Sequence, residues 1–425
     1  MTSTPDAPSC GCSDFQAGRR RFLKGSLGAA GTLAATAVFG DVFTQVSYGA
    51  ETGGNVLVVL SLRGGADGLS MVVPHGDRDY APARPRIAVP AGQLLAADPM
   101  FGLHPAFAPL LPLWNTGRFA AVQAVGLPQP NRSHFAAMEA VEDADPGSAE
   151  RRGWINRMVG LVGTANPAEA IQLGTPMAPT ALYGSAPTLA ADRLRDLQLS
   201  GSSDPVWRRR QEDSLVRVWG SASGALGRGA RSALGTTTTF SALASAAVRP
   251  QNGAAYPSGG LGTALAETAA LVRADLGTRV VTLDYGSWDM HTSMGTVSSG
   301  QMRNRVDEMA RALGAFFADL GALGDRVTVV TLSEFGRRVA ENGANGLDHG
   351  HGNCVLVLGG GVRGGQYYGT WPGLADGRLV SGDLAVTTDY RSVVAEIVGA
   401  RFPSASLASL FPSFAPSPLG LMSVA

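Results

Sequence analysis

Residues 55–68 read NVLVVLSLRGGADG, and this stretch decides the fold. Its first eight residues form a nearly continuous apolar run, in which polar and apolar positions do not alternate. Such a run predicts a β-strand that is covered on both faces, as in a mostly parallel sheet. The glycine-rich turn that follows places Asp67 just beyond the carboxyl end of this strand.

Four other segments have the same apolar character, and helical patterns lie between them. The predicted strands are residues 119–125, 279–283, 326–332 and 354–358, and the predicted helices are residues 105–115, 133–142, 263–276, 301–320 and 390–398. Alternating strands and helices predict an α/β fold, with a mostly parallel central sheet sandwiched between helices. Residues 201–260 are rich in Gly, Ser, Ala and Thr, which predicts a helical or irregular insertion or cap.

The first fifty residues have the pattern of an export signal. Residues 19–24 read RRRFLK and lead into an apolar, small-residue stretch that ends near Gly40. This order is typical of a twin-arginine signal, and the stretch is too short and too rich in Gly and Ala to span a membrane stably. We therefore expect residues 1–50 to be read by the twin-arginine translocase and removed. Residues 51–425 are then expected to form a single domain, without a membrane span, in the periplasm or outside the cell.

Composition excludes some classes of partner. The chain has 34 basic and 34 acidic residues, so its formal net charge gives no reason to expect binding to nucleic acid or to a membrane surface. Beyond the signal the only cysteine is Cys354, so the mature chain has no internal disulfide. Cys354 opens an apolar run and is predicted to be a core residue.

Acidic and histidine side chains follow several of the predicted strands. These candidates are Asp67, Asp289, His291, Glu334, Asp348, His349 and His351. Because the carboxyl ends of parallel strands meet at one edge of a sheet, we expect these side chains to gather there. Carboxylates and imidazoles are ligands for divalent metals such as Zn, Mn, Mg, Ca or Fe, and converging acids repel one another unless a cation lies among them. The sequence therefore predicts a metal site at this edge.

Simpler interpretations of the same residues remain open. They are a turn former at Asp67, a local hydrogen-bonded pair of Asp289 and His291, and an ion pair between Glu334 and Arg337. Two histidines, His75 and His104, have no acidic or hydroxyl neighbour placed as it is beside the site candidates. We expect those two histidines to have structural roles.

Residues 130–135 read PNRSHF and open a predicted helix after the strand 119–125. A serine at a helix N-terminus lies where backbone N–H groups and the helix dipole favour an anion. Ser133 is therefore a candidate nucleophile or ligand of a phosphate-like group. The alternative is that Asn131 or Ser133 only caps the helix.

Six motifs, taken in order, resemble the DUF1501 proteins, a family of unknown function. They are LRGGADG at 62–68, GLHP at 102–105, NRSHF at 131–135, WDMH at 288–291, SEFGR at 333–337, and DHGH at 348–351 with GGG at 359–361. This family looks like a distant branch of the alkaline phosphatase/sulfatase superfamily. The resemblance implies an alkaline-phosphatase-like α/β domain with a metal site at the carboxyl edge of its sheet.

The resemblance also implies roles for individual residues. It matches Asp67 to the first metal aspartate, Ser133 to the nucleophile, Asp289 and His291 to an Asp/His metal pair, and His349 or His351 to a late histidine ligand. Glu334 stands where the superfamily usually has an Asp-His pair. The chain departs from that pattern at Phe335, which occupies the place of a histidine ligand, and in the tight spacing of Asp289 and His291.

Together these observations favour an exported metal-dependent hydrolase of phosphate or sulfate esters. In this hypothesis Ser133 attacks the ester, the metal stabilises the developing charge, and Arg132 or Arg337 clamps the anion. The ligand would be a small anionic ester. One alternative is a non-catalytic protein on the same fold that binds an envelope polymer or a secreted partner. A third hypothesis is a metal-dependent phosphosugar mutase or isomerase.

Overall fold

The computed structural model describes residues 53–145, 151–160, 166–199, 201 and 204–423. The predicted signal segment, residues 1–50, lies outside the described residues. Among the helices that are described, none has both the length and the apolar character needed to cross a membrane.

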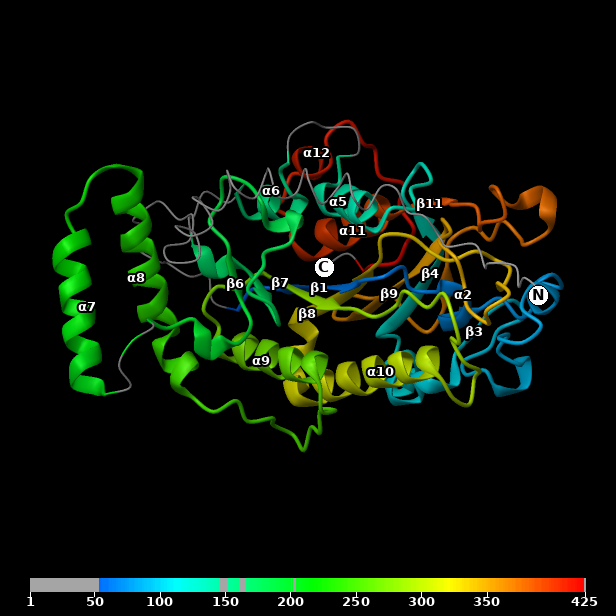
Figure 1. Cartoon of the computed structure of the whole chain (residues 1–425), viewed down its shortest axis with the longest axis horizontal. Coiled ribbons are helices and arrows are strands. Elements are labelled where there is room, and N and C mark those ends of the chain that lie inside the picture. The colour runs from blue at the N-terminus through cyan, green and yellow to red at the C-terminus, as the bar shows by residue number, and fades with distance from the viewer. Residues whose placement is uncertain (1–52, 146–150, 161–165, 200, 202–203, 424–425) are drawn as a thin grey trace, which may run out of the picture.

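The centre of the molecule is a mixed, mostly parallel sheet of nine strands in the order β10-β4-β9-β8-β1-β7-β5-β6, with β11 beside β4 (Figure 1). The strands are β1 (Val56–Leu62), β4 (Phe119–Gly126), β5 (Ala170–Leu173), β6 (Leu189–Ala191), β7 (Val280–Tyr285), β8 (Val327–Leu332), β9 (Asn353–Gly359), β10 (Tyr367–Tyr368) and β11 (Thr388–Asp389). All five predicted strands are confirmed. Four short strands, β5, β6, β10 and β11, were not predicted, since two to four residues are too few for a recognisable pattern.

Strand β1 shows why its sequence is apolar throughout. It pairs in parallel with β7 on one side and β8 on the other. Val58 and Leu60 belong to the hydrophobic core on one face of the sheet, and Leu57 and Val59 belong to the core on the opposite face. Successive strand residues point to opposite faces, so both sets must be apolar. The prediction of a strand covered on both sides is confirmed.

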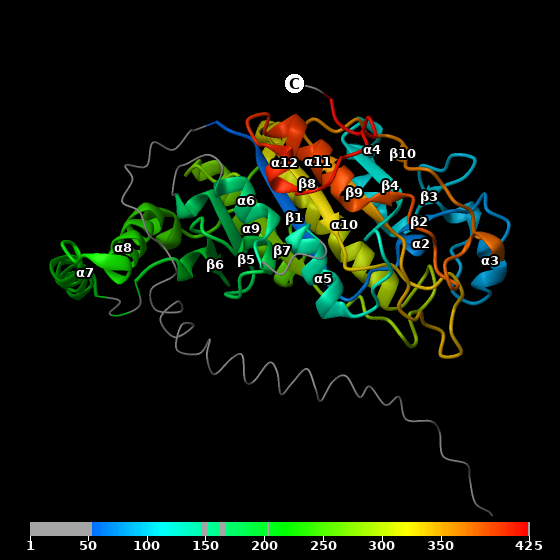
Figure 2. The same ribbon diagram turned by 90° about the horizontal axis from the view of Figure 1, so that it is seen from above.

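Helices cover both faces of the sheet (Figures 1 and 2). One face is covered by α5 (His134–Asp143), α6 (Trp154–Gly160), α11 (Tyr390–Arg401) and α12 (Leu407–Leu410). The other face is covered by the 3₁₀ segment η2 (Pro105–Leu110), α4 (Leu111–Asn115), α9 (Gly260–Ala274) and α10 (Gln301–Leu320). The single helix predicted over residues 105–115 is wrong in detail, because prolines at 109 and 112 interrupt it and divide it into η2 and α4.

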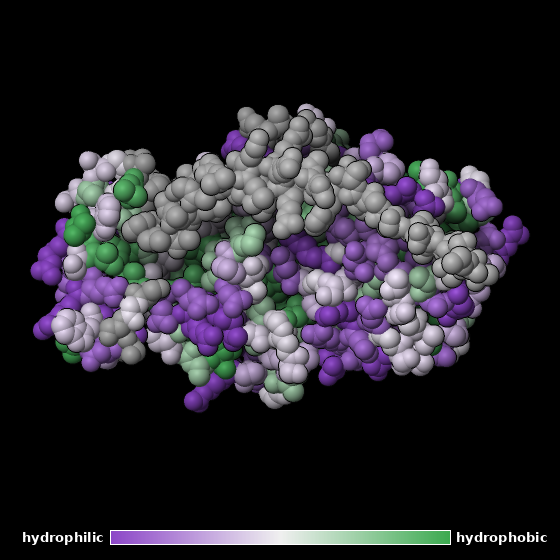
Figure 3. Space-filling view, in the orientation of Figure 1, coloured by the Kyte–Doolittle hydropathy of each residue, from purple (hydrophilic) through white to green (hydrophobic). Residues whose placement is uncertain are grey.

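The chain between β6 and α9 forms a helical projection at one end of the molecule (Figures 1 and 2). It consists of α7 (Pro205–Trp219) and α8 (Gly224–Ser245), and Asp204 caps α7 by accepting hydrogen bonds from the N–H groups of Val206 and Trp207. Hydrophobic residues of this projection lie at the surface among hydrophilic ones (Figure 3). Residues 201–260 were predicted to be a helical or irregular insertion or cap, and α7 and α8 are helices within that range.

The direction of β9 determines where the polar loops meet. Strand β9 is antiparallel to both of its neighbours, β4 and β8. The residues that precede β9 therefore lie at the same edge of the sheet as the residues that follow β1, β4, β7 and β8. Side chains from five loops can meet at this one edge.

Replacing Leu60 by Ala tests the central position of β1. Leu60 is completely buried, so the change should lower the free energy of unfolding by about 3–4 kcal/mol, through lost apolar contact and the cavity left behind. Urea unfolding measures this loss. The matched control is Leu226→Ala on α8, where the side chain is 52% exposed and a change within about 0.5 kcal/mol is expected. Equal effects of the two changes would contradict the assignment of β1 as the core strand.

Candidate metal centre

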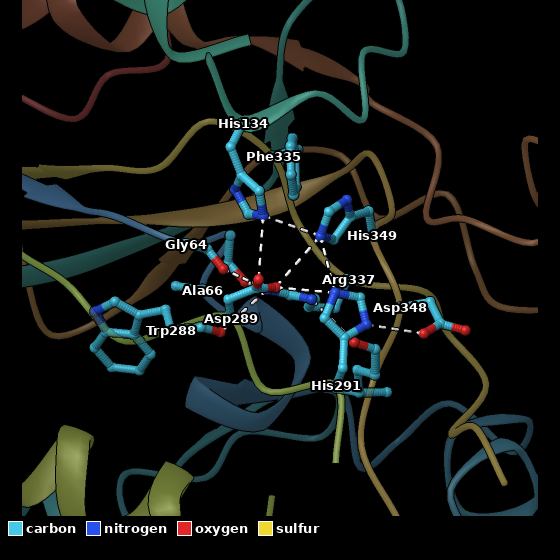
Figure 4. Close-up of polar contacts among 12 residues, drawn as sticks. Gly64, Ala66, His134, Trp288, Asp289, His291, Phe335, Arg337, Asp348 and His349 are labelled. Atoms are coloured by element: carbon cyan, nitrogen blue, oxygen red, sulfur yellow. Dashed lines mark hydrogen bonds and ion pairs between the residues drawn. The ribbon is translucent and has the colours of Figure 1, made fainter. Parts of the chain in front are cut away.

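Three imidazoles and one carboxylate converge at the edge of the sheet (Figure 4). His134 is the first residue of α5, which follows β4. Asp289 and His291 lie in the loop after β7, and His349 lies just before β9. The edge therefore brings together residues that are more than 200 positions apart in the chain.

The tightest group consists of His134, Asp289 and His349, whose potential ligand atoms all lie within 4.8 Å of one another. Nε2 of His134 is 3.0 Å from Nε2 of His349, and Asp289 approaches these atoms at 3.5 Å and 3.3 Å. Ligands held about 2.0–2.1 Å from a tetrahedral zinc ion lie roughly 3.3 Å from one another. The spacing of this group therefore fits a shared ion.

His291 adjoins the same group. Its Nε2 atom lies 3.0 Å from Nε2 of His349 and 3.0 Å from Oδ1 of Asp289. Three Nε2 atoms and one carboxylate thus face a common region, and the three imidazoles and Asp289 are between 24% and 46% exposed, so solvent reaches them.

The Nδ1 atom of each imidazole faces an acceptor from another part of the chain. The three pairs are His134 with Oε1 of Glu334 at 2.7 Å, His291 with Oδ1 of Asp348 at 3.0 Å, and His349 with the carbonyl oxygen of Arg132 at 2.9 Å. A carbonyl cannot donate, and an ionised carboxylate cannot either, so these partners assign the ring proton to Nδ1 in each neutral imidazole. All three Nε2 atoms then present lone pairs.

Lone pairs on three nitrogens and a carboxylate repel one another at about 3 Å unless a cation or an added proton lies among them. Histidines that bind metals usually donate their other ring N–H to a carboxylate or a backbone carbonyl, as these three do. Nitrogen and oxygen donors of this kind suit Zn²⁺ and related transition metals. The donor set therefore fits a divalent metal.

The buried side chain of Arg337 connects the loops that carry these candidate ligands. Its guanidinium, 1% exposed, donates to Oδ1 of Asp289 at 2.7 Å. The same group donates to the main-chain oxygens of Gly64, Gly65, Trp288 and Leu347. Burial alone would raise the pKa of Asp289, but the hydrogen bond and charge of Arg337 outweigh it and lower that pKa. Asp289 is therefore kept ionised.

Glu334 and Asp348, both predicted as metal ligands, instead lie behind imidazoles. Glu334 is buried, and its Oε1 atom accepts from Nδ1 of His134 and from the N–H of Gly64 at 2.8 Å. Burial would raise its pKa, but these hydrogen bonds lower it. The hydrogen bond from His291 is the main cause that lowers the pKa of Asp348. Each carboxylate orients one histidine, and that histidine lies between the carboxylate and the proposed ion.

Asp67 and His351 lie apart from this group. Arg84 donates to both carboxylate oxygens of Asp67, at 2.5 Å and 2.9 Å, and the pair is buried. His351 is also buried, and its Nε2 atom contacts the carbonyl oxygen of Leu127 at 2.9 Å. The interactions of both residues are directed elsewhere, so we leave them out of the proposed site.

Ser133 is the residue immediately before His134 and the N-cap of α5. Its hydroxyl makes no capping hydrogen bond, while its own N–H donates to the side chain of Asn131 at 3.0 Å. The side chain is exposed. The hydroxyl therefore remains available at the start of a ten-residue helix.

Phe335 forms an apolar wall of the site. It is buried, and its ring centroid lies 4.9 Å from the ring of His134 and 4.9 Å from the ring of His349 (Figure 4). The phenyl ring therefore packs against two of the candidate ligands.

His134 was not among the residues predicted to form the site. Its position in the sequence could have indicated it, because His134 opens the helix after β4 and so lies at the expected edge of the sheet. Two other histidines behave as predicted: His104 is buried and accepts from the N–H of Ala106, and burial lowers its pKa to about 4. The ring of His75 contacts the carbonyl oxygen of Asp98.

A family model described as "Protein of unknown function (DUF1501)" matches residues 114–394, about two thirds of the chain. The chain belongs to the DUF1501 family. No curated protein matches it.

Several solved structures resemble this DUF1501 chain at low identity. The C-terminal periplasmic domain of EcEptC from Escherichia coli, solved as a complex with Zn, has a TM-score of 0.35 at 9% identity, over 88% of this chain and 91% of that one. The lipoteichoic acid synthase LtaP from Listeria monocytogenes has a TM-score of 0.31 at 10% identity, over 79% and 71%. Alkaline phosphatase from the Antarctic bacterium TAB5 has a TM-score of 0.28 at 10% identity, over 74% and 94%. Likenesses this distant say nothing about the chemistry of this chain.

Replacing Arg337 by Lys tests whether its hydrogen bonds stabilise the loops around the centre. A lysine ammonium is a compact charge without the planar fork, and it cannot satisfy the same five acceptors. We expect the free energy of unfolding to fall by roughly 3 kcal/mol, because buried carbonyl oxygens lose their donors. Urea unfolding measures it. The control is the neighbouring Arg338→Lys, whose side chain is 39% exposed and whose replacement should cost less than about 0.5 kcal/mol.

Proposed function

We propose that this protein holds a divalent metal through His134, Asp289 and His349, with His291 beside them. The observation that carries the proposal is the common orientation of the imidazoles, whose Nδ1 atoms face fixed acceptors while their Nε2 atoms face one another and Asp289. Three ligands of this kind leave room for a further ligand, which is typical of catalytic sites more than of closed structural ones.

We further propose that the protein is an exported hydrolase of phosphate or sulfate esters. A metal in this place would supply electrostatic stabilisation of the charge that develops on the ester oxygens. The chain's own residues hold the site in shape: Arg337 fixes Asp289, and Glu334 fixes His134. Export through the twin-arginine route, to the periplasm or beyond, belongs to this proposal and rests on residues 1–50.

Ser133 is the proposed nucleophile. In the first step a bond forms between its Oγ atom and the phosphorus or sulfur, the bond to the leaving alcohol breaks, and the serine proton passes through solvent to that alcohol. Water then cleaves the serine ester, which releases the inorganic anion and restores the hydroxyl. The free hydroxyl of Ser133, next to His134 and at the N-terminus of α5, supports this role.

A second candidate is a non-catalytic binding protein that keeps the metal for structure. Two observations favour it: Phe335 replaces an expected ligand, and Arg337, one of the predicted anion clamps, is buried with its donors already in use. This protein would bind an envelope polymer. A phosphosugar mutase or isomerase is a third candidate, and it predicts no release of 4-nitrophenol in the hydrolase assay below.

Metal analysis of the mature protein, purified from its export compartment, tests the proposed centre. We expect close to one equivalent of Zn²⁺ or Mn²⁺, and its loss from both His134→Ala and His349→Ala, since each change removes a ligand. Glu334→Gln should weaken binding by about 10–100-fold, because it no longer orients His134 as well. His75→Ala, outside the centre, serves as the control and should keep its metal. A wild-type protein that binds neither ion, even when both are added, would falsify the metal proposal.

Hydrolysis of 4-nitrophenyl phosphate and 4-nitrophenyl sulfate tests the nucleophile. If Ser133 attacks the ester, Ser133→Ala should lower kcat by roughly 10³-fold or more at unchanged metal content. The exposed Ser214→Ala on α7 is the matched control and should retain full activity. Full turnover by Ser133→Ala would remove Ser133 from the mechanism. A metal-loaded wild type that hydrolyses neither ester would reject the hydrolase and leave the binding protein and the phosphosugar mutase or isomerase.

A further inference from the structure

Two arginines share one buried carboxylate, Asp383. Asp383 is completely buried, while the side chains of Arg132 and Arg338 are 38% and 39% exposed. Arg132 donates to Oδ2 of Asp383 through Nε, at 3.1 Å, and through Nη2. Nε of Arg338 lies 3.9 Å from Oδ1, which is an ion-pair distance without a hydrogen bond. Two positive charges thus face one buried negative charge, and the carboxylate of Asp348 also interacts electrostatically with Arg338.

Both arginines are tied to the margin of the proposed metal centre. The carbonyl oxygen of Arg132 is the acceptor that faces Nδ1 of His349. The backbone N–H of Arg338 donates to the carbonyl oxygen of Asp348 at 3.0 Å. Arg338 also directly follows Arg337, which binds Asp289. The backbone on which each arginine stands is therefore fixed relative to the histidines.

Arg338 differs from its neighbour in how its donors are used. The guanidinium of Arg337 is buried and donates to five oxygens, whereas that of Arg338 donates no hydrogen bond within the described part of the chain. Gly382 makes room for it: a Cβ atom at that position would lie 2.7 Å from Nη1 of Arg338. A planar fork of unused N–H donors, partly open to solvent, suits a tetrahedral oxyanion bound through two oxygens.

We propose that Arg338 and Arg132, positioned by the buried Asp383, form the anion-binding subsite of this centre, with a phosphate or sulfate group as the ligand. The proposal rests on the proposed function for its biological meaning. It assigns anion binding to Arg338, whereas the sequence predicted Arg132 or Arg337 in that role. Asp383 keeps the two guanidiniums in place, and the N–H donors that Arg338 does not use within the described residues bind the anion. A solvated surface ion pair is the simpler alternative, and it predicts no anion binding at this place.

Calorimetric titration of the mature protein with inorganic phosphate and, separately, with inorganic sulfate tests the subsite. Arg338→Met should weaken binding of the preferred anion by at least about 10-fold, since a charge-assisted pair of hydrogen bonds is lost. Arg338→Lys should restore part of this affinity through its charge alone. Arg311→Met on α10, which removes another half-exposed arginine, is the control and should bind as the wild type does. The ratio of the phosphate and sulfate affinities identifies the group that the subsite prefers.

The zinc content of each sample, measured in parallel, separates this proposal from the metal proposal. Equal zinc and equal anion affinity in the wild type and in Arg338→Met would overturn the subsite while leaving the metal centre intact. A wild type that binds neither phosphate nor sulfate would also overturn it. A wild type without zinc, whose phosphate affinity still falls in Arg338→Met, would support the subsite and reject the metal centre.

Discussion

The buried guanidinium of Arg337 is the interaction on which the candidate site depends. A charged group that is 1% exposed is tolerated only when its donors are satisfied, and here they meet four backbone oxygens and one carboxylate. Those oxygens belong to the loops after β1 and β7 and to the segment before β9. One side chain therefore fixes three loops from distant parts of the sequence, and it fixes Asp289 with them.

A second layer of acceptors sets the orientation of the histidines. Glu334, Asp348 and the carbonyl of Arg132 each face one Nδ1 atom, which leaves each Nε2 atom directed toward the others. This arrangement is unfavourable unless a cation or an added proton lies among the Nε2 atoms, so it indicates a functional site more strongly than the presence of three histidines alone. Elsewhere in the molecule, buried carboxylates such as Asp67 and Asp383 are paired with arginine. Asp289 is also paired with an arginine, Arg337, but three histidines lie beside it as well.

Part of this cluster of side chains was predictable from the sequence, and the differences between prediction and structure have one physical origin. Asp289, His291 and His349 were expected at the carboxyl edge of the sheet and lie together there. Position in a loop places a residue at an edge, but it does not say whether a carboxylate points to the centre, to the back of an imidazole, or to an arginine. Glu334, Asp348 and Asp67 were therefore all predicted as ligands, although only tertiary contacts distinguish their roles.

The sequence by itself determined the five long strands, most of the helices between them and the edge where the polar loops gather, because apolar runs and turn residues act through nearby positions. Only the tertiary structure decided the rest. The acceptor that orients His134 lies 200 residues away in the chain, and the pairing of Asp67 with Arg84 depends on how two loops pack. Of two adjacent arginines, Arg337 is buried and Arg338 is open to solvent. Which donor meets which acceptor is decided by distances between elements, and a pattern along the chain does not contain those distances.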